Sequence, residues 1–205
     1  YENLYTGGGD RDIRSGSRTG YLLYKVIPIR ANKYDDGYGW GSRNHIHISG
    51  MRLADIYLMY AEAAANGYNS PQGQDANYDK SAIDAINIIR KRAGVDPVHN
   101  KYLGSVTSFM KELQREREVE LAYEGHRFND LRRWLLLTEY PYTLKTSQEF
   151  DRAPGFNPNK PEDNKVLNFK ETVILERQLS SKHYWLPLKN VDVNMYLEFP
   201  QNPGW

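Results

Sequence analysis

The clearest helical pattern of apolar positions lies in residues 51–66. Leu53, Ile56, Tyr57 and Tyr60 fall at i, i+3, i+4 and i+7. This spacing places side chains on one face of an α-helix. We therefore predict a helix here whose Leu53 to Tyr60 stripe faces the core. The charged residues expected to decorate the helix are Arg52, Asp55 and Glu62.

A second helix is predicted over residues 79–93. Asp79 is a suitable N-cap, and Gly94 follows the last apolar position as a stop signal. The first two helices would form a helical hairpin. The residues of the second helix expected to face inward are Ile83, Ile86 and Ile89.

The segment 105–137 predicts two more helices, over residues 108–124 and 127–138, separated by Gly125. On a helical wheel, Met110, Leu113 and Leu121 fall within an arc of about 80°. The same arc contains Arg117 and Glu124, with Glu120 at its edge, so charged side chains point inward. An unpaired buried charge costs several kcal/mol. We therefore expect Arg117 to pair with Glu120 or Glu124, and the network to include the arginines after the turn: Arg127, Arg132 and Arg133.

This charged cluster has two interpretations. Glutamates at 116, 120 and 124 followed by His126 could be catalytic. However, five arginines lie among them, at 115, 117, 127, 132 and 133. Buried Arg–Glu networks more often hold helices together than carry out chemistry. We predict a structural role.

The glycine-rich loop 34–41 is the candidate binding site. Tyr34, Tyr38 and Trp40 have little around them to pack against, and exposed aromatic faces suit stacking on sugars or aromatic ligands. The alternative is a loop folded back with Trp40 in the core. The residues predicted to hydrogen-bond ligand hydroxyls are Asp35, Asp36, Arg43 and Asn44.

Metal chemistry is weakly indicated. Asp35 and Asp36 could contribute to a Ca²⁺ site, although the EF-hand spacing is not met. His45 and His47 would share one face of a strand, but no third ligand is near them, which favours a hydrogen-bonded pair. We expect no cofactor and no metal.

Composition excludes several classes of protein. The 205 residues carry a net charge of +1, from 27 basic and 26 acidic residues, so no general attraction to nucleic acid or anionic lipid is expected. The absence of cysteine excludes disulfides, zinc-thiolate sites and thiol nucleophiles. The chain begins at Tyr1 without methionine, signal peptide or lipid-attachment cysteine, which we interpret as a fragment.

Several motifs occurring in order resemble one family, the SusD/RagB nutrient-binding lipoproteins of Bacteroidetes. Residues 52–63 (RLADIYLMYAEA) resemble its hallmark helix, and AIDAIN at 82–87 with Arg90 and RAG at 92–94 resembles the next. The segments similar to its most recognisable motif are RER at 115–117, EL at 120–121, EGHR at 124–127 and DLRRW at 130–134. YWLP at 184–187 and QNPGW at 201–205 also fit.

The resemblance implies a mainly α fold of tetratricopeptide-like helix pairs with long irregular loops and a few short strands. This chain would be the C-terminal part, with a loop-rich segment at 1–50, a helical region at 51–139 and an irregular region at 140–205. Because helical repeats bury their apolar faces against neighbours, a fragment should expose apolar surface or self-associate.

The resemblance also implies a function. Family members are lipid-anchored outer-membrane proteins that bind glycans at the cell surface, partner a SusC-like TonB-dependent transporter and are not enzymes. The anchor would lie outside this chain. Three alternatives remain: a peptide-binding member of the same system, a helical-repeat scaffold for proteins, and a hydrolase, which would need two carboxylates at a fixed gap.

Overall fold

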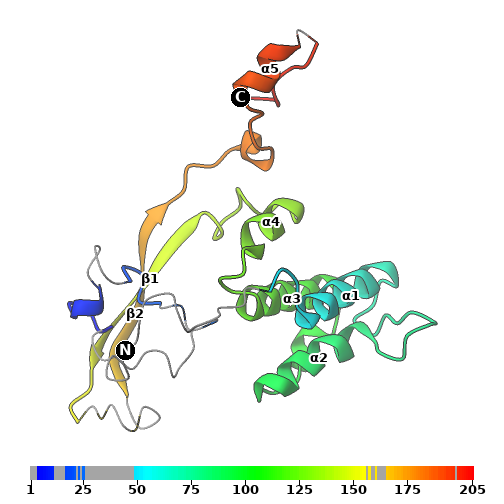
Figure 1. Ribbon diagram of the computed structural model, residues 1–205. Helices are drawn as coiled ribbons and strands as arrows, with labels where there is room; N and C mark the ends of the chain where they lie inside the picture. Colours follow the sequence, from blue (N-terminus) through cyan, green and yellow to red (C-terminus); the bar gives the residue numbers. More distant parts are fainter. Residues whose placement is uncertain are drawn as a thin grey trace, which may run out of the picture. The chain divides into compact units, whose positions relative to one another are not determined.

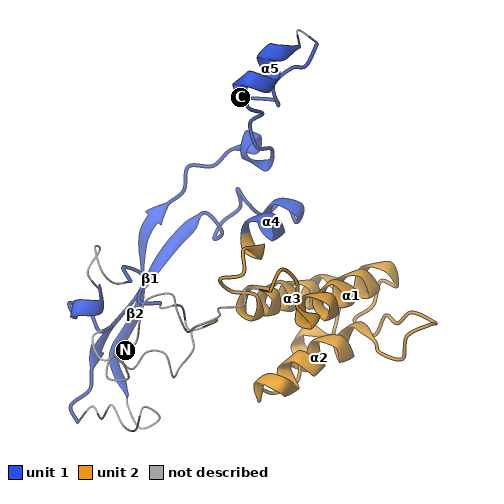
Figure 2. Ribbon diagram, in the orientation of Figure 1, with its two compact units in different colours: residues 1–24, 128–205 blue, residues 25–127 orange. Residues whose placement is uncertain are grey.

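The computed structural model describes residues 4–11, 17–21, 23, 25, 49–155, 157, 160, 165–196 and 198–205. The chain divides into two compact units (Figure 2). One combines Tyr1–Tyr24 with Phe128–Trp205, and the other is Lys25–Arg127. The three-segment division made from the sequence stays a prediction.

The structure is mainly helical (Figure 1), as the resemblance implied. The helical unit contains α1 (Leu53–Gly67), α2 (Ala82–Ala93), the 3-10 turn η4 (Asn100–Tyr102) and α3 (Val106–Glu120). Helix α4 (His126–Arg133) begins in this unit and continues into the other. The other unit contains η1 (Gly9–Arg11), β1 (Leu144–Arg152), β2 (Val166–Glu176), η6 (Ser181–Tyr184) and α5 (Asn190–Met195).

Helix α1 packs on both α2 and α3. Its buried face is largely alanine, which allows the helices to approach closely. Leu58, Ile86, Phe109 and Leu113 are fully buried and fill the space between the three helices. The other buried residues of α1 are Ala54, Asp55, Ala61, Ala64 and Ala65.

The prediction of which face of α1 is buried is wrong. Leu53 is 66% exposed and Ile56 is 42% exposed. Helix α1 is apolar on two faces, and the alanine face, centred about 120° away on the helical wheel, is the one in contact with α2 and α3. The expected exposed apolar surface is confirmed on the described residues.

The caps of α2 agree with the prediction at the C-terminal end of the helix and differ from it at the N-terminal end. Gly94 has φ +71° and ends the helix in the left-handed conformation, as predicted. The N-cap is Ser81 and not Asp79. The Ser81 hydroxyl accepts a hydrogen bond from the backbone N–H of Asp84, and the Asp84 carboxylate accepts one from the backbone N–H of Ser81. This reciprocal pair is a capping box, which satisfies two amide groups at once.

The turn between α3 and α4 differs in extent from its prediction. Gly125 has φ +81° and lies in the turn as expected, but α3 ends at Glu120. Glu124 is therefore not on the α3 wheel. Helix α4 ends at Arg133, and Leu135 has φ +59°, which breaks the predicted continuation to residue 138.

The unit that combines Tyr1–Tyr24 with Phe128–Trp205 contains an antiparallel hairpin of β1 and β2. Strand β1 lies within a region that the sequence predicted to be irregular. The fully buried Ser147 of β1 accepts a hydrogen bond from Arg11 Nη2 at 2.8 Å, and Arg11 also pairs with Glu149 at 2.7 Å. The N-terminal segment is thereby attached to the hairpin.

Candidate functional site

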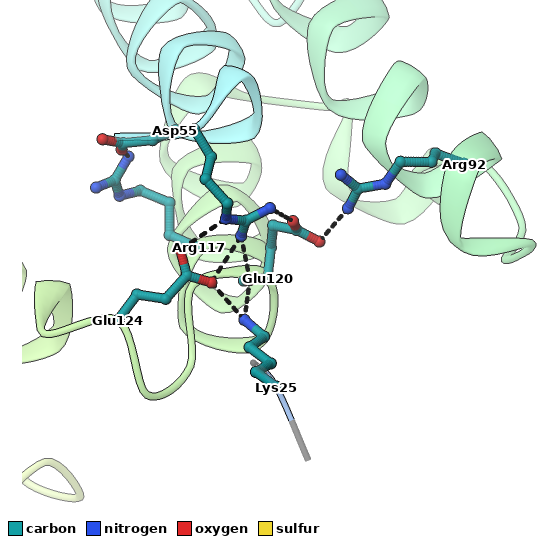
Figure 3. Close-up of polar contacts among 7 residues, drawn as sticks. Lys25, Asp55, Arg92, Arg117, Glu120 and Glu124 are labelled. Carbon is teal, nitrogen blue, oxygen red and sulfur yellow. Dashed lines mark hydrogen bonds and ion pairs between the residues drawn. The ribbon is translucent and has the colours of Figure 1, made fainter. Parts of the chain in front are cut away.

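The most buried ion pair of the helical unit joins α3 to α1. Arg117 Nη1 lies 2.8 Å from Asp55 Oδ1, and the two side chains are 4% and 5% exposed (Figure 3). Packing of the alanine face of α1 brings Asp55 inside, so its expected position on the outer surface is wrong. The pair links α3 to α1 through two residues that are 62 positions apart in the sequence.

Glu120 and Glu124 share one cation, Arg52, and each has a second cation of its own. Arg52 lies 2.9 Å from Glu120 and 2.7 Å from Glu124. Lys25 lies 2.6 Å from Glu124, and Arg92 of α2 lies 2.7 Å from the other oxygen of Glu120 (Figure 3). The expected pairing of Arg117 with these glutamates is thus replaced by the pairing with Asp55.

This cluster also closes the C-terminal end of α3. The backbone carbonyl of Glu120 accepts hydrogen bonds from Lys25 Nζ at 2.6 Å and Arg52 Nη2 at 2.9 Å. Carbonyls at a helix C-terminus lack partners within the helix and carry partial negative charge, so two cations here are stabilising.

A second cluster joins α2 to α3. Arg90 Nη1 lies 3.0 Å from Glu112 and 2.8 Å from Glu116. Arg115, one turn along α3, donates to Glu112 at 2.7 Å. Both glutamates are buried. Glu116 therefore has a cationic partner on the neighbouring helix α2. Glu112 has one on α2 and one on its own helix.

These contacts favour the ionised form of two of the carboxylates, Glu112 and Glu124. The hydrogen bond from Arg115 lowers the pKa of Glu112 below its ordinary value, against the opposing effect of burial. Burial alone would raise the pKa of Glu124, but hydrogen bonds from Arg52 and Lys25 lower it. A carboxylate in this state cannot serve as a general acid at neutral pH. The arrangement can hold helices together but does not favour proton transfer.

The arginines after Gly125 bind outside this cluster. Arg127 pairs with Glu118 at 3.0 Å and Arg133 pairs with Asp130 at 2.8 Å. Arg132 donates to the backbone carbonyl of Tyr184 at 2.8 Å. These contacts take the place of the expected contacts with Glu120 and Glu124.

Sequence reasoning missed the partners that come from the chain before α3. The wheel of α3 could not show Lys25, Arg52, Asp55, Arg90 or Arg92, which lie elsewhere in the chain. Asp55 did carry a signal, since it lies three residues before the buried Leu58. Lys25 carried none, because only folding brings it to Glu124, 99 residues away.

The predicted ligand-binding residues lie outside the described part of the chain. These are Tyr34, Asp35, Asp36, Tyr38, Trp40, Arg43 and Asn44, and the same holds for His45 and His47. Within the described ranges, no group of three or more His, Asp or Glu side chains could hold a metal ion. No helix in those ranges is long and apolar enough to cross a membrane.

A hollow of about 420 Å³ lies on the exposed face of α1. The Tyr60 hydroxyl donates to the carbonyl of Lys80 at 2.6 Å, which ties α1 to the loop that follows it. The rings of Tyr60 and Tyr78 meet edge to face with centroids 4.9 Å apart. The residues that line the hollow are Leu53, Ile56, Tyr57, Tyr60, Asp75, Asn77 and Tyr78.

Comparisons with known proteins agree with each other. A sequence model of the SusD family matches residues 2–205. The chain is 35% identical over 96 residues to SusD-like protein P25 of Formosa agariphila, which covers 46% of this chain and 16% of that protein.

Two solved structures are also similar. One is a SusD-like protein from Bacteroides fragilis NCTC 9343, with TM-score 0.56 and 26% identity over 76% of this chain and 25% of that one. The other is the protein BT4246, with TM-score 0.62 and 28% identity over 94% of this chain and 29% of that one. The chain spans less than a third of these proteins.

Proposed function

The chain belongs to the SusD family, and from this premise we propose that it is part of a surface nutrient-binding protein of the outer membrane. The protein binds glycans and passes them to a SusC-like TonB-dependent transporter. A lipid anchor that is not among these residues holds it at the membrane. The family match along residues 2–205 is the observation that carries the proposal.

The charge network supports binding without catalysis. A glycoside hydrolase needs one carboxylic acid whose pKa is raised and a second carboxylate at a fixed distance from it. Here Glu112 and Glu124 have lowered pKa values and are held by arginine or lysine. These two carboxylates are therefore suited to structure, and we propose that the protein is not an enzyme.

We place the ligand site in the aromatic loop. Tyr34, Tyr38 and Trp40 would form a shallow stacking surface for the apolar face of a sugar ring. Four polar residues of the same stretch would hydrogen-bond to the sugar hydroxyls: Asp35, Asp36, Arg43 and Asn44. Tyrosine and tryptophan supply such surfaces at low entropic cost because their side chains have two rotatable bonds.

The test is calorimetric titration of the full-length gene product with a panel of oligosaccharides and short peptides. Trp40→Ala should weaken binding of the best glycan by at least about fivefold, since stacking on one aromatic ring contributes about 1 kcal/mol or more. Trp185→Ala is the matched control, because Trp185 is 58% exposed in the other unit.

Each outcome separates the candidates. Equal glycan affinity for the Trp40→Ala variant and the parent would remove the loop from the site. Binding of peptides alone would favour the peptide-binding alternative. Turnover of any oligosaccharide by the purified protein would overturn the non-catalytic assignment.

A further inference from the structure

A second hollow, of about 460 Å³, lies in the unit that contains β1 and β2. Its volume is within the range of sites that bind small molecules. The wall consists of two arginines, one acidic residue and three consecutive glycines: Arg11, Arg18, Glu149, Gly7, Gly8 and Gly9. A Cβ atom added to Gly7 or Gly9 would meet nothing within 4 Å, so the glycines leave space beside the backbone. We call this site the arginine hollow.

Strand β1 holds the chain on both sides of the arginine hollow. The backbone N–H of Thr6, directly before the glycines, donates to the carbonyl of Phe150 at 2.8 Å. The backbone N–H of Gln148 donates to the carbonyl of Thr19, directly after the second arginine, at 3.0 Å. A wall fixed in this way loses less conformational entropy when a ligand binds.

The acidic residue of the hollow is already paired. One oxygen of Glu149 accepts from Arg11 Nη2 at 2.7 Å, and the other accepts from the hydroxyl of Thr6 at 2.9 Å. The hydroxyl of Ser147 also donates to Glu149, and this hydrogen bond lowers the pKa of the carboxyl group. Glu149 is therefore ionised at neutral pH and its charge is balanced by Arg11. The charge of Arg18 remains uncompensated in the wall.

Several donors of the wall lack acceptors among the described residues. Arg18 is hydrogen-bonded through its backbone carbonyl, but its guanidinium has no partner there. The same is true of the backbone N–H groups of Gly7 and Gly9. The Arg11 side chain is 8% exposed, and its Nη1, enclosed beside Gly20, has no acceptor within the described ranges. Buried polar groups are nearly always hydrogen-bonded, so this incomplete pairing makes further negative charge nearby favourable.

These free groups determine the chemistry of the ligand. All of them are donors, so the ligand has to supply acceptors. A planar guanidinium matches the oxygens of a carboxylate or a sulfate and can bind two of them at once. Backbone N–H groups in tight turns also bind anions. A neutral sugar hydroxyl can accept one of these hydrogen bonds, but it carries no charge to compensate Arg18.

We propose that the arginine hollow binds an oxyanion, and that this oxyanion is the carboxylate or sulfate group of an acidic sugar. Arg18 binds the oxyanion directly, and Arg11 supplies a second, fixed positive charge. The N–H groups of Gly7 and Gly9 donate to the remaining oxygens. The identification of the ligand as a sugar rests on the proposed function, whereas oxyanion binding rests on the hollow alone.

The test is calorimetric titration of the full-length gene product. The probes are oligosaccharides of galacturonic acid, glucuronic acid and sulfated galactose, each compared with a neutral oligosaccharide of the same length, and sodium sulfate. Arg18→Gln should weaken binding of the best acidic oligosaccharide by at least about tenfold, because it removes a charge-assisted hydrogen bond. Arg177→Gln is the matched control, since Arg177 is an exposed arginine of the same unit outside the hollow.

Two further readouts separate charge recognition from a general loss of structure. The Arg18→Gln variant should bind neutral oligosaccharides as the parent does. For the parent, the affinity for the acidic oligosaccharide should fall as the salt concentration rises, and this dependence should be weaker in Arg18→Gln, because salt screens the interaction between charges.

The outcomes also separate this proposal from the proposed function. A parent that binds acidic oligosaccharides no better than their neutral counterparts, or an Arg18→Gln variant with parental affinity for them, would overturn the site. If Trp40→Ala still weakens glycan binding in that case, the proposed function stands. If the protein binds sulfate but no oligosaccharide, and Arg18→Gln abolishes the sulfate binding, the oxyanion site stands and the proposed function is refuted.

Discussion

Replacing Arg117 by methionine should destabilise the helical unit strongly. The change leaves Asp55 inside the unit, with its side chain 5% exposed and its ion-pair partner removed. Breaking a buried pair by removing one partner costs about 3–5 kcal/mol, because the remaining charge is neither hydrated nor compensated. A typical domain has only about 5–15 kcal/mol of stability, so the loss is a large fraction of the total.

The assay is urea unfolding of the 205-residue chain, followed by circular dichroism at 222 nm. With a slope of about 2 kcal/mol per M, the midpoint of the helical transition should fall by about 2 M. Arg92→Met is the matched control. Its side chain is 56% exposed, and its partner Glu120 keeps Arg52, so the change should cost less than about 1 kcal/mol.

A double variant separates charge from packing. Adding Asp55→Ala to Arg117→Met removes the uncompensated carboxylate, and most of the lost stability should return, since apolar replacements of buried pairs are often close to neutral. The reasoning is refuted if Arg117→Met unfolds within about 1 kcal/mol of the parent, or if it costs no more than Arg92→Met.

Two further predictions concern single contacts. Glu112→Gln should be less stable than the parent at pH 7, and the difference should shrink as the pH falls below about 4.3, the unfolded-state value. The hydrogen bond from Arg115 lowers the pKa of Glu112 in the folded state. The ionised Glu112 side chain therefore stabilises the folded protein above the unfolded-state pKa, and this stabilisation is lost as the pH falls through the folded-state pKa. Denaturation at pH 7, 5 and 3 measures this, and a constant difference would contradict it. Ser81→Ala should cost about 1 kcal/mol because it removes the cap of α2, whereas Asp79→Ala should cost less than about 0.5 kcal/mol. Thermal melts of the two variants compare them, and equal losses would count against Ser81 as the cap.

The sequence predicted helices well where the signal was local. Helices were expected close to where α1 and α2 lie, and the left-handed glycines at 94 and 125 were placed correctly. Each of these depends on residues within one or two turns of each other, which hydrophobic periodicity and turn chemistry report directly. The motifs of the family are of the same kind, and the family match confirms that reading.

The candidate site was predictable only in part. The inward charges of α3 could be recognised, because Arg117 lies on its apolar arc. Their partners could not, because Asp55, Arg52 and Lys25 are far from α3 in the sequence and approach it only on folding. A wheel describes one helix and carries no information about the next.

The sequence by itself determined that charged side chains of α3 turn inward, that α1 carries more apolar surface than a solvent-facing helix needs, and that the chain is a SusD family member. Only the tertiary structure decided which face of α1 is buried. Alanines permit the closest approach of α2 and α3, so the alanine face fills the core, and the larger Leu53 and Ile56 remain outside it. Close packing across helices depends on the shapes of all three at once.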